Sequence, residues 1–219
     1  MSDATYGQLL ELAAAVALVA SIVMLWRRSL EAIVRTLAVQ AIAVAATSLL
    51  IGVHEAHVAE IAIGGVILAV KALLIPSLLM RVLRTTGDQR VSEPVLNTAT
   101  SLVIAAILTL GAFATTGSVV RLVGGEEGRL LPVGIAIVLV AYFGLVTRRN
   151  ALAQIVGFLQ LENGIAIVAL LASSGGSLLI EIGTALDLVL AVLVLQVLIG
   201  RMQSKHGVLD LDNLRELRD

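Results

Sequence analysis

Three ionisable residues lie deep inside long apolar stretches of the sequence: Lys71, Glu162 and Asp187. A charged side chain at the centre of a bilayer costs about 2.5–3.5 kcal/mol on insertion scales, so each of these residues requires a reason. Counted along a helix from the nearest arginine at the end of its stretch, they lie roughly 15, 20 and 21 Å deep at about 1.5 Å per residue. These depths fall in the middle third of a bilayer whose hydrocarbon is about 30 Å thick. The sequence therefore predicts one shared polar layer on three helices.

Proton transfer is the chemistry that such a layer can perform. A carboxyl group in a low-dielectric environment favours its neutral form, whereas a nearby ammonium favours the carboxylate, so a pair of them can change protonation state when a neighbour moves. Glu162, Asp187 and Lys71 have the residue types for this role, and Glu181, nearer the outer end of its stretch, extends the proposed proton path. The alternative is a buried ion pair that fixes helix packing without any proton moving.

Helix-disturbing residues beside these charges favour the proton-transfer interpretation. Pro76 follows Lys71 by five residues and cannot donate to the carbonyl one turn earlier, which predicts a kink. Irregular backbone at this depth is tolerated only against protein or a wet cavity. Asn163 and Gly164 directly follow Glu162 and are expected to loosen their helix in the same way.

The composition identifies the elements that must position these residues as membrane helices. Hydrophobic residues make up 58% of the 219-residue chain and charged residues 14%, with a mean hydropathy of +1.01. A soluble domain carries about 45–50% apolar and about 25% charged residues. Apolar runs without strand-like alternation recur along the chain and predict an all-α integral membrane protein of about seven transmembrane helices. The predicted spans are 5–26, 31–53, 60–82, 95–117, 130–147, 150–172 and 178–200.

The basic residues predict the orientation of these spans. The loops after the first, third and fifth spans, with the span ends beside them and the C-terminal tail, hold 12 of the 15 Lys and Arg residues. The positive-inside rule then places the N-terminus outside and the C-terminus in the cytoplasm. The N-terminal apolar stretch is too long, and lacks the basic n-region, for a cleavable signal, so we expect a retained first helix.

A faint internal repeat predicts how the spans are grouped. Two motifs recur at an offset of 121 residues, an Arg pair (Arg27-Arg28 and Arg148-Arg149) and a Glu-Ile pair (Glu60-Ile61 and Glu181-Ile182). Nearly the same offset brings Gln40 opposite Glu162. This pattern favours a parallel repeat of two three-helix units, and chance similarity among Ala-, Leu- and Val-rich helices is the equal alternative. The predicted division is 1–94 (three-helix unit), 95–129 (linking helix and loop), 130–200 (second three-helix unit) and 201–219 (cytoplasmic tail).

Redox cofactors and metals are not expected in this chain. It contains no cysteine, which excludes disulfides, cysteine-ligated iron–sulfur clusters and a thiolate-bound nickel site. The segment His54-Glu55-Ala56-His57 lacks the spacing of the H-E-x-x-H zinc motif and lies in a short outer loop, so we expect no metal there. We expect contact with the lipid bilayer and no nucleic-acid partner.

Several motifs together resemble the E component of hydrogenase-4 and formate hydrogenlyase-type complexes, the group 4 nickel–iron hydrogenases. The resemblance covers most of the chain and is densest from about 145 to 219. The last three spans are also similar to the K subunit of complex I and to the C subunit of multisubunit cation/proton antiporters, although Glu162 comes three residues after Leu159, the position of the K-subunit glutamate. The motifs are Lys71 with Pro76, Arg148-Arg149-Asn150, Gln154-Ile155-Val156-Gly157, Glu162-Asn163-Gly164, Glu181-Ile182-Gly183 with Asp187, and His206-Gly207-Val208-Leu209-Asp210.

The resemblance implies a non-catalytic subunit in the membrane arm of a complex I-related oxidoreductase of the prokaryotic cytoplasmic membrane. Its partners would be antiporter-like membrane subunits, a complex I-like membrane anchor subunit and hydrogenase-like hydrophilic subunits. Nickel, iron and iron–sulfur clusters would belong to those partners, while the carboxylates of this chain would take part in coupled proton translocation. The alternatives are a subunit of a cation/proton antiporter without redox chemistry, a self-contained carrier and a purely structural membrane scaffold.

Overall fold

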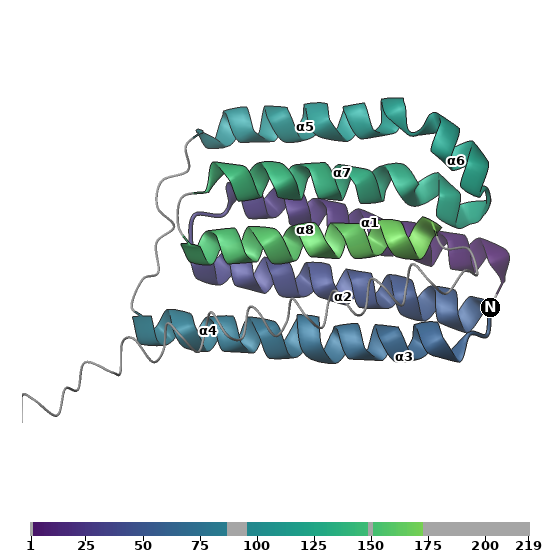
Figure 1. The fold of residues 1–219 in the computed structure, drawn as a ribbon, viewed down its shortest axis with the longest axis horizontal. Helices are drawn as coiled ribbons and strands as arrows, with labels where there is room; N and C mark the ends of the chain where they lie inside the picture. Colours follow the sequence, from purple (N-terminus) through teal and green to yellow (C-terminus); the bar gives the residue numbers. More distant parts are fainter. Residues whose placement is uncertain (1, 87–95, 149–150, 173–219) are drawn as a thin grey trace, which may run out of the picture.

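A computed structural model of the chain describes residues 2–86, 96–148 and 151–172, and every element in these ranges is a helix. The helices lie side by side with their axes roughly parallel to the long direction of the molecule (Figure 1). Their bounds are α1 Asp3–Trp26, α2 Leu30–His54, α3 Val58–Ile67, the π-helical segment η1 Leu68–Leu74, α4 Ile75–Thr86, α5 Thr98–Thr115, α6 Gly117–Val123, α7 Gly125–Thr147 and α8 Ala151–Ala172.

Six stretches of the described residues are long and apolar enough to cross a membrane, which confirms the first six predicted spans. One of them runs without a break from α3 through η1 into α4, over Val58–Arg84. The seventh predicted span, 178–200, lies outside the described residues together with Glu181 and Asp187. The orientation in the membrane, the internal repeat and the division into units stay predictions.

The fifth span begins earlier than the sequence predicted. Helix α7 starts at Gly125 instead of residue 130, and the short helix α6 precedes it where a loop was expected. Gly124 and Gly125 both have φ near +70°, a conformation that glycine adopts without strain, and they turn the chain sharply between the two helices. Glu126 and Glu127 then occupy the first turn of α7, where negative charge is favourable.

Polar caps define the beginnings of three other helices. Ser2 accepts a hydrogen bond from the backbone N–H of the third residue along at the start of α1, and Ser29 does the same for α2, each at 3.3 Å. Asn97 caps α5 with a bond of 2.8 Å. Each cap satisfies one of the N–H groups that a helix N-terminus leaves without an intrahelical partner. Short polar breaks therefore divide an otherwise apolar chain into separate helices.

Helices α1, α2, α7 and α8 form the centre of the bundle. Helix α1 packs on α2 and α7, and α8 packs on α7 and α2, while the α3–η1–α4 rod lies along α2 and α5 lies along α7 (Figure 1). Large apolar side chains cover the outside; Leu110, for example, is 70% exposed and Leu73 is 64% exposed. A soluble protein rarely exposes such continuous apolar surface, whereas lipid tails solvate it.

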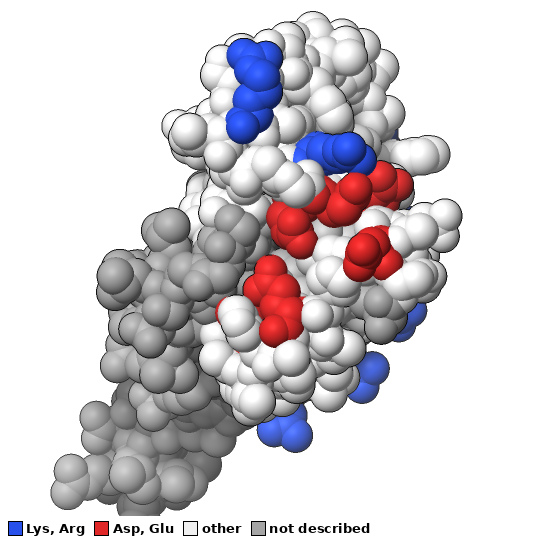
Figure 2. Space-filling model, turned by 90° about the vertical axis from the view of Figure 1, so that its right-hand side faces the viewer, with Lys and Arg blue, Asp and Glu red and all other residues white. Residues whose placement is uncertain are grey.

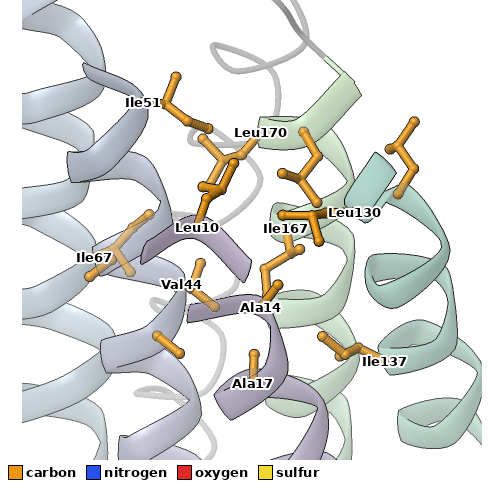
Figure 3. Packing of buried hydrophobic residues seen from close by; sticks show 14 of the residues in the cluster. Leu10, Ala14, Ala17, Val44, Ile51, Ile67, Leu130, Ile137, Ile167 and Leu170 are labelled. Carbon is orange, nitrogen blue, oxygen red and sulfur yellow. The ribbon is translucent and has the colours of Figure 1, made fainter. Parts of the chain in front are cut away.

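The buried apolar side chains form two clusters, one towards each end of the bundle. The Leu10 cluster includes Leu10, Ala14 and Ala17 of α1, Val44 and Ile51 of α2, Ile67 of α3, Leu130 and Ile137 of α7, and Ile167 and Leu170 of α8 (Figure 3). The Leu79 cluster includes Met24, Leu30, Ile33, Val34, Leu37, Ile75, Leu79, Val82, Leu83, Leu152, Val156 and Leu159. On helices α1, α2 and α8, and along the α3–η1–α4 rod, the two clusters occupy separate stretches of sequence, which leaves a gap between them.

Helices α7 and α8 approach each other closely at two glycines. A Cβ atom added to Gly164 would lie 2.9 Å from Cγ2 of Ile137 and 3.0 Å from the backbone nitrogen of Val138. A Cβ atom on Gly134 would lie 2.8 Å from Cγ2 of Val168. Helix α8 continues without interruption through Gly164, so this glycine permits close packing instead of loosening the helix as the sequence suggested.

Candidate functional site

A layer of buried polar side chains fills the gap between the two apolar clusters. On each helix the polar residue lies between the stretch that joins the Leu10 cluster and the stretch that joins the Leu79 cluster. Because this holds on four different elements, the polar groups lie at one level near the middle of the bundle. The layer consists of Ser21 on α1, Gln40 on α2, Lys71 on η1, and Gln160, Glu162 and Asn163 on α8, all of them buried.

Lys71 and Glu162 form an ion pair in this layer. The Lys71 Nζ atom lies 3.2 Å from Oε1 of Glu162, and the two side chains are 7% and 5% exposed. Lys71 is midway along the Val58–Arg84 span, and Glu162 is near the midpoint of the 22-residue helix α8. The structure thus brings together two of the three mid-depth charges that the sequence singled out. The ion pair joins the α3–η1–α4 rod to the central helix α8 at the depth where a charge in the membrane is most costly.

The backbone around Lys71 is π-helical. The segment η1 covers Leu68–Leu74, and the N–H of Ile75 donates to the carbonyl of Val70, five residues back. Pro76 follows Ile75 directly and has no N–H with which to continue the hydrogen-bond ladder. The π-helical spacing therefore comes immediately before the position at which the proline interrupts the ladder. Single π-helical turns inside α-helices are rare and occur frequently at functional sites. The expected irregularity beside Lys71 therefore takes the form of a widened helical turn.

A chain of side-chain hydrogen bonds extends the layer from α8 across to α1. Asn163 donates from Nδ2 to Oε1 of Gln40 at 3.2 Å, and Gln40 donates from Nε2 to the hydroxyl of Ser21 at 2.7 Å. That hydroxyl donates in turn to the carbonyl of Ala17 at 2.9 Å. Gln160 donates to the backbone carbonyl of Ser21 at 3.2 Å. Amides and hydroxyls do not titrate in this setting, so they add fixed dipoles to the layer and no further charge.

Two members of this layer were not predicted from the sequence. Ser21 and Gln160 were not among the predicted site residues, although each is a polar residue in the interior of a long apolar stretch. That property was the available signal, because a buried polar group needs a partner and its partner lies at the same depth. The predicted supporting residues Gln40, Asn163 and Pro76 are all buried close to the layer. Asp187 and Glu181 belong to the undescribed part of the chain.

A second group of polar residues lies at the end of the bundle that carries the N-terminus. In Figure 2 acidic side chains gather on this face. The contacts of Tyr6, His54 and His57, and the closeness of Glu126 to Gly7, bring Asp3, Glu55, Glu60, Glu126 and Glu127 to this end. Tyr6 donates a short hydrogen bond to Glu127, and its ring stacks on that of His54 with 3.9 Å between centroids. Glu60 is buried, and its Oε1 lies 3.5 Å from Nδ1 of His57. The positive-inside rule predicts that this end of the bundle lies outside, and that orientation stays a prediction.

The described residues show no group of three or more His, Cys, Asp or Glu side chains placed to hold a metal ion. In the His54–His57 segment, His57 Nδ1 lies 3.3 Å from a carboxylate oxygen of Glu55, and His54 contacts Asp3 at 3.7 Å. The two histidines thus pair with different carboxylates. The arrangement fits surface hydrogen bonding and ion pairing at the end of the bundle.

Comparison with known proteins relates the chain to a hydrogenase component. It is 46% identical over 220 positions to the uncharacterized protein Rv0085 of Mycobacterium tuberculosis, an alignment that covers 100% of both chains. It is 30% identical over 149 positions to hydrogenase-4 component E of Escherichia coli strain K12, which covers 68% of each chain, and the same figures hold for hydrogenase-4 component E of Shigella flexneri. No family model matches the chain. No solved structure matches it either.

Proposed function

We propose that this chain, which belongs to the family of hydrogenase-4 component E, is a membrane subunit of a hydrogenase-like complex and contributes the Lys71–Glu162 pair to its proton-translocation path. The observation that carries the proposal is the ion pair itself. Its atoms are 3.2 Å apart, both side chains are buried, and it lies midway along two membrane-length helices. A purely structural contact at this depth could be made at lower cost by apolar residues.

The pair can couple proton occupancy to helix position. While both groups are ionised, their charges cancel and the pair tolerates the low-dielectric interior. Protonation of Glu162 removes this compensation and leaves the Lys71 ammonium facing a neutral acid, which favours separation of η1 from α8. The π-helical turn that carries Lys71 provides a segment whose hydrogen-bond register can change between five-residue and four-residue spacing. Proton binding on α8 would then shift the rod that contains Lys71.

The remaining members of the layer would keep this site polar while excluding bulk water. Gln40, Asn163 and Ser21 form a continuous hydrogen-bonded chain in the same layer as Glu162, so fixed dipoles accompany the ion pair at this depth. We include Asp187 and Glu181 in the proposed path on sequence grounds alone. They would extend it from the middle of the membrane towards the outer side.

Redox chemistry would take place in partner subunits. The chain has no cysteine to hold nickel or an iron–sulfur cluster, so its donor set does not fit these groups. We expect this subunit to lie in the cytoplasmic membrane of a prokaryote, with hydrogenase-like hydrophilic subunits, a membrane anchor subunit and antiporter-like subunits as partners.

The test is the substitution Glu162→Gln in the assembled complex. Glutamine keeps the size and hydrogen-bonding capacity of the side chain but cannot release a proton. We expect the complex to assemble and to retain its redox activity, while proton uptake into inverted vesicles per turnover falls by roughly tenfold or more, in line with a general acid–base role. Glu11→Gln, at an exposed carboxylate of α1, is the matched control and should pump normally. Normal pumping by Glu162→Gln would remove Glu162 from the path.

Purification separates the redox-linked proposal from an antiporter. Gentle-detergent isolation of the tagged chain should bring along hydrophilic hydrogenase-like subunits, with nickel and iron detected by metal analysis. Iron without nickel would keep the architecture and change the reaction. If antiporter subunits alone accompany the chain and no metal is found, the redox assignment is wrong and the Lys71–Glu162 pair would belong to an ion carrier.

A further inference from the structure

A buried arginine lies at the other end of the bundle from the acidic face. Arg148 directly follows α7, and although it lies between two helices it is only 8% exposed. Its Nη2 donates to the backbone carbonyl of Met24, but its buried Nη1 has no hydrogen-bond partner. Burial lowers the pKa of Arg148 to about 10, so the guanidinium is still charged at neutral pH. A buried cationic donor of this kind requires an acceptor, preferably an anionic one.

Arg148 lines a strongly basic cavity of about 280 Å³. Arg27 and Arg28 line the same cavity, and so do Trp26 and Ser101, whereas no Asp or Glu of the described residues contributes to it. The first residues of the 18-residue helix α5 also line it, which adds the positive end of a helix dipole. Three arginines, residues with hydroxyl groups and a helix N-terminus line this cavity, and this combination is suited to a phosphate group.

The basic cavity adjoins an apolar groove. Arg27 also lines a groove of about 940 Å³ between α1 and α2, whose wall includes Val23, Val19, Val16 and Leu12 along one face of α1. From Leu12 to Val23 the helix rises roughly 16 Å at about 1.5 Å per residue, which matches one leaflet of a bilayer about 30 Å thick. A third hollow, lined by Val23, Trp26 and Arg27, shares residues with both and lies between them. The basic cavity, the third hollow and the apolar groove thus form one continuous depression, with the charge at one end and the apolar surface at the other.

We propose that this site binds an anionic phospholipid. Its phosphate would lie against Arg27, Arg28 and Arg148, and one acyl chain would lie in the groove between α1 and α2. The charge pattern selects an anionic head group, and the apolar groove selects a lipid over a free anion. Basic pockets between transmembrane helices on the cytoplasmic side are established head-group sites, and the positive-inside rule predicts that the arginine-rich end faces the cytoplasm.

The fluorescence of a tryptophan beside the cavity can report lipid binding at this site. Trp26 is the single tryptophan in the sequence; it lines the cavity and is 63% exposed. The full-length chain is reconstituted into phosphatidylcholine vesicles that contain increasing mole fractions of brominated phosphatidylglycerol or brominated phosphatidylcholine. Bromine quenches the Trp26 fluorescence when a lipid occupies the site. We expect phosphatidylglycerol to bind roughly tenfold more strongly than phosphatidylcholine, about the effect of one or two charge-assisted hydrogen bonds.

Two variants test the residues that would bind the phosphate. Arg148→Gln and the double variant Arg27→Gln/Arg28→Gln should each lose most of the roughly tenfold preference for phosphatidylglycerol. The double variant changes only exposed side chains, so it keeps the test valid even if Arg148→Gln does not fold. Arg121→Gln, at an exposed arginine at the opposite end of the bundle, makes the same change in charge as Arg148→Gln and should leave the preference intact.

Four outcomes would overturn the proposal. Equal quenching by the two lipids, or an unchanged preference in the double variant, would show that the arginines do not select the head group. Displacement of brominated phosphatidylglycerol by millimolar inorganic phosphate would show a site for a free anion. If the isolated chain shows no preference but the double variant loses its partner subunits in the purified complex, the cavity receives an acidic segment of a protein.

Discussion

A double-mutant cycle on Lys71 and Glu162 tests whether the buried ion pair exists and how strongly it couples two helices. Lys71→Met removes the ammonium and keeps an unbranched side chain of similar length. Glu162→Gln removes the carboxylate charge and keeps the shape of the side chain. The two single variants and the double variant, compared with the original chain, isolate the interaction energy of the pair.

The expected magnitudes follow from distance and burial. At 3.2 Å and an effective dielectric constant of about 20, the attraction between the two charges is roughly 5 kcal/mol. Either single substitution leaves one buried charge without its compensation, and the free energy of unfolding should fall by about 3–5 kcal/mol. In the double variant neither residue carries a charge, so no charge is desolvated. Its stability should lie within about 1–2 kcal/mol of the original, or above it.

The measurement is reversible unfolding of the purified chain in mixed micelles, with SDS as denaturant and helical circular dichroism as signal. The combination of Lys71→Met with Glu11→Gln is the control, because Glu11 is exposed on α1 and its contribution should simply add. If the losses in Lys71→Met and Glu162→Gln sum to that of the double variant within about 0.5 kcal/mol, the two side chains do not interact and the reasoning fails.

Two further predictions use the same unfolding assay. Gly164→Ala places a methyl group against the backbone of α7 and should lower the free energy of unfolding by about 1–3 kcal/mol. The control is Gly111→Ala, where a Cβ meets open space and the change should be neutral or slightly stabilising. Equal effects of the two substitutions would contradict the close α7–α8 packing. Gln40→Leu removes the acceptor of the buried Asn163 amide and the donor to the Ser21 hydroxyl, and should cost about 1–3 kcal/mol. Gln8→Leu on the exposed face of α1 should have little effect, and a neutral Gln40→Leu would mean that the hydrogen-bonded chain contributes nothing to stability.

The sequence determined the class of the protein and most of its helices. Apolar runs of membrane length separated by short polar breaks leave a chain few alternatives, because a backbone in lipid must satisfy its own hydrogen bonds. The same reasoning identified Lys71 and Glu162, since charge within such a run is visible without any structure. Local backbone detail was less accessible. The early start of α7 depends on two glycines with positive φ, which a hydropathy profile does not register.

Tertiary structure decided which of the buried charged residues contact one another and which polar residues accompany them. The sequence placed Lys71, Glu162 and Asp187 at similar depths, but depth leaves the direction around each helix axis open, and the packing of α8 against the neighbouring helices turns Glu162 towards Lys71. Ser21 and Gln160 are visible in the sequence as polar residues inside apolar stretches, but only the structure shows which groups they bind. Arg148 reads as an ordinary interfacial arginine in the sequence, yet helix packing buries it beside Met24. Periodicity and hydropathy describe one helix at a time, whereas a site is made between helices, where distances of a few ångströms decide the chemistry.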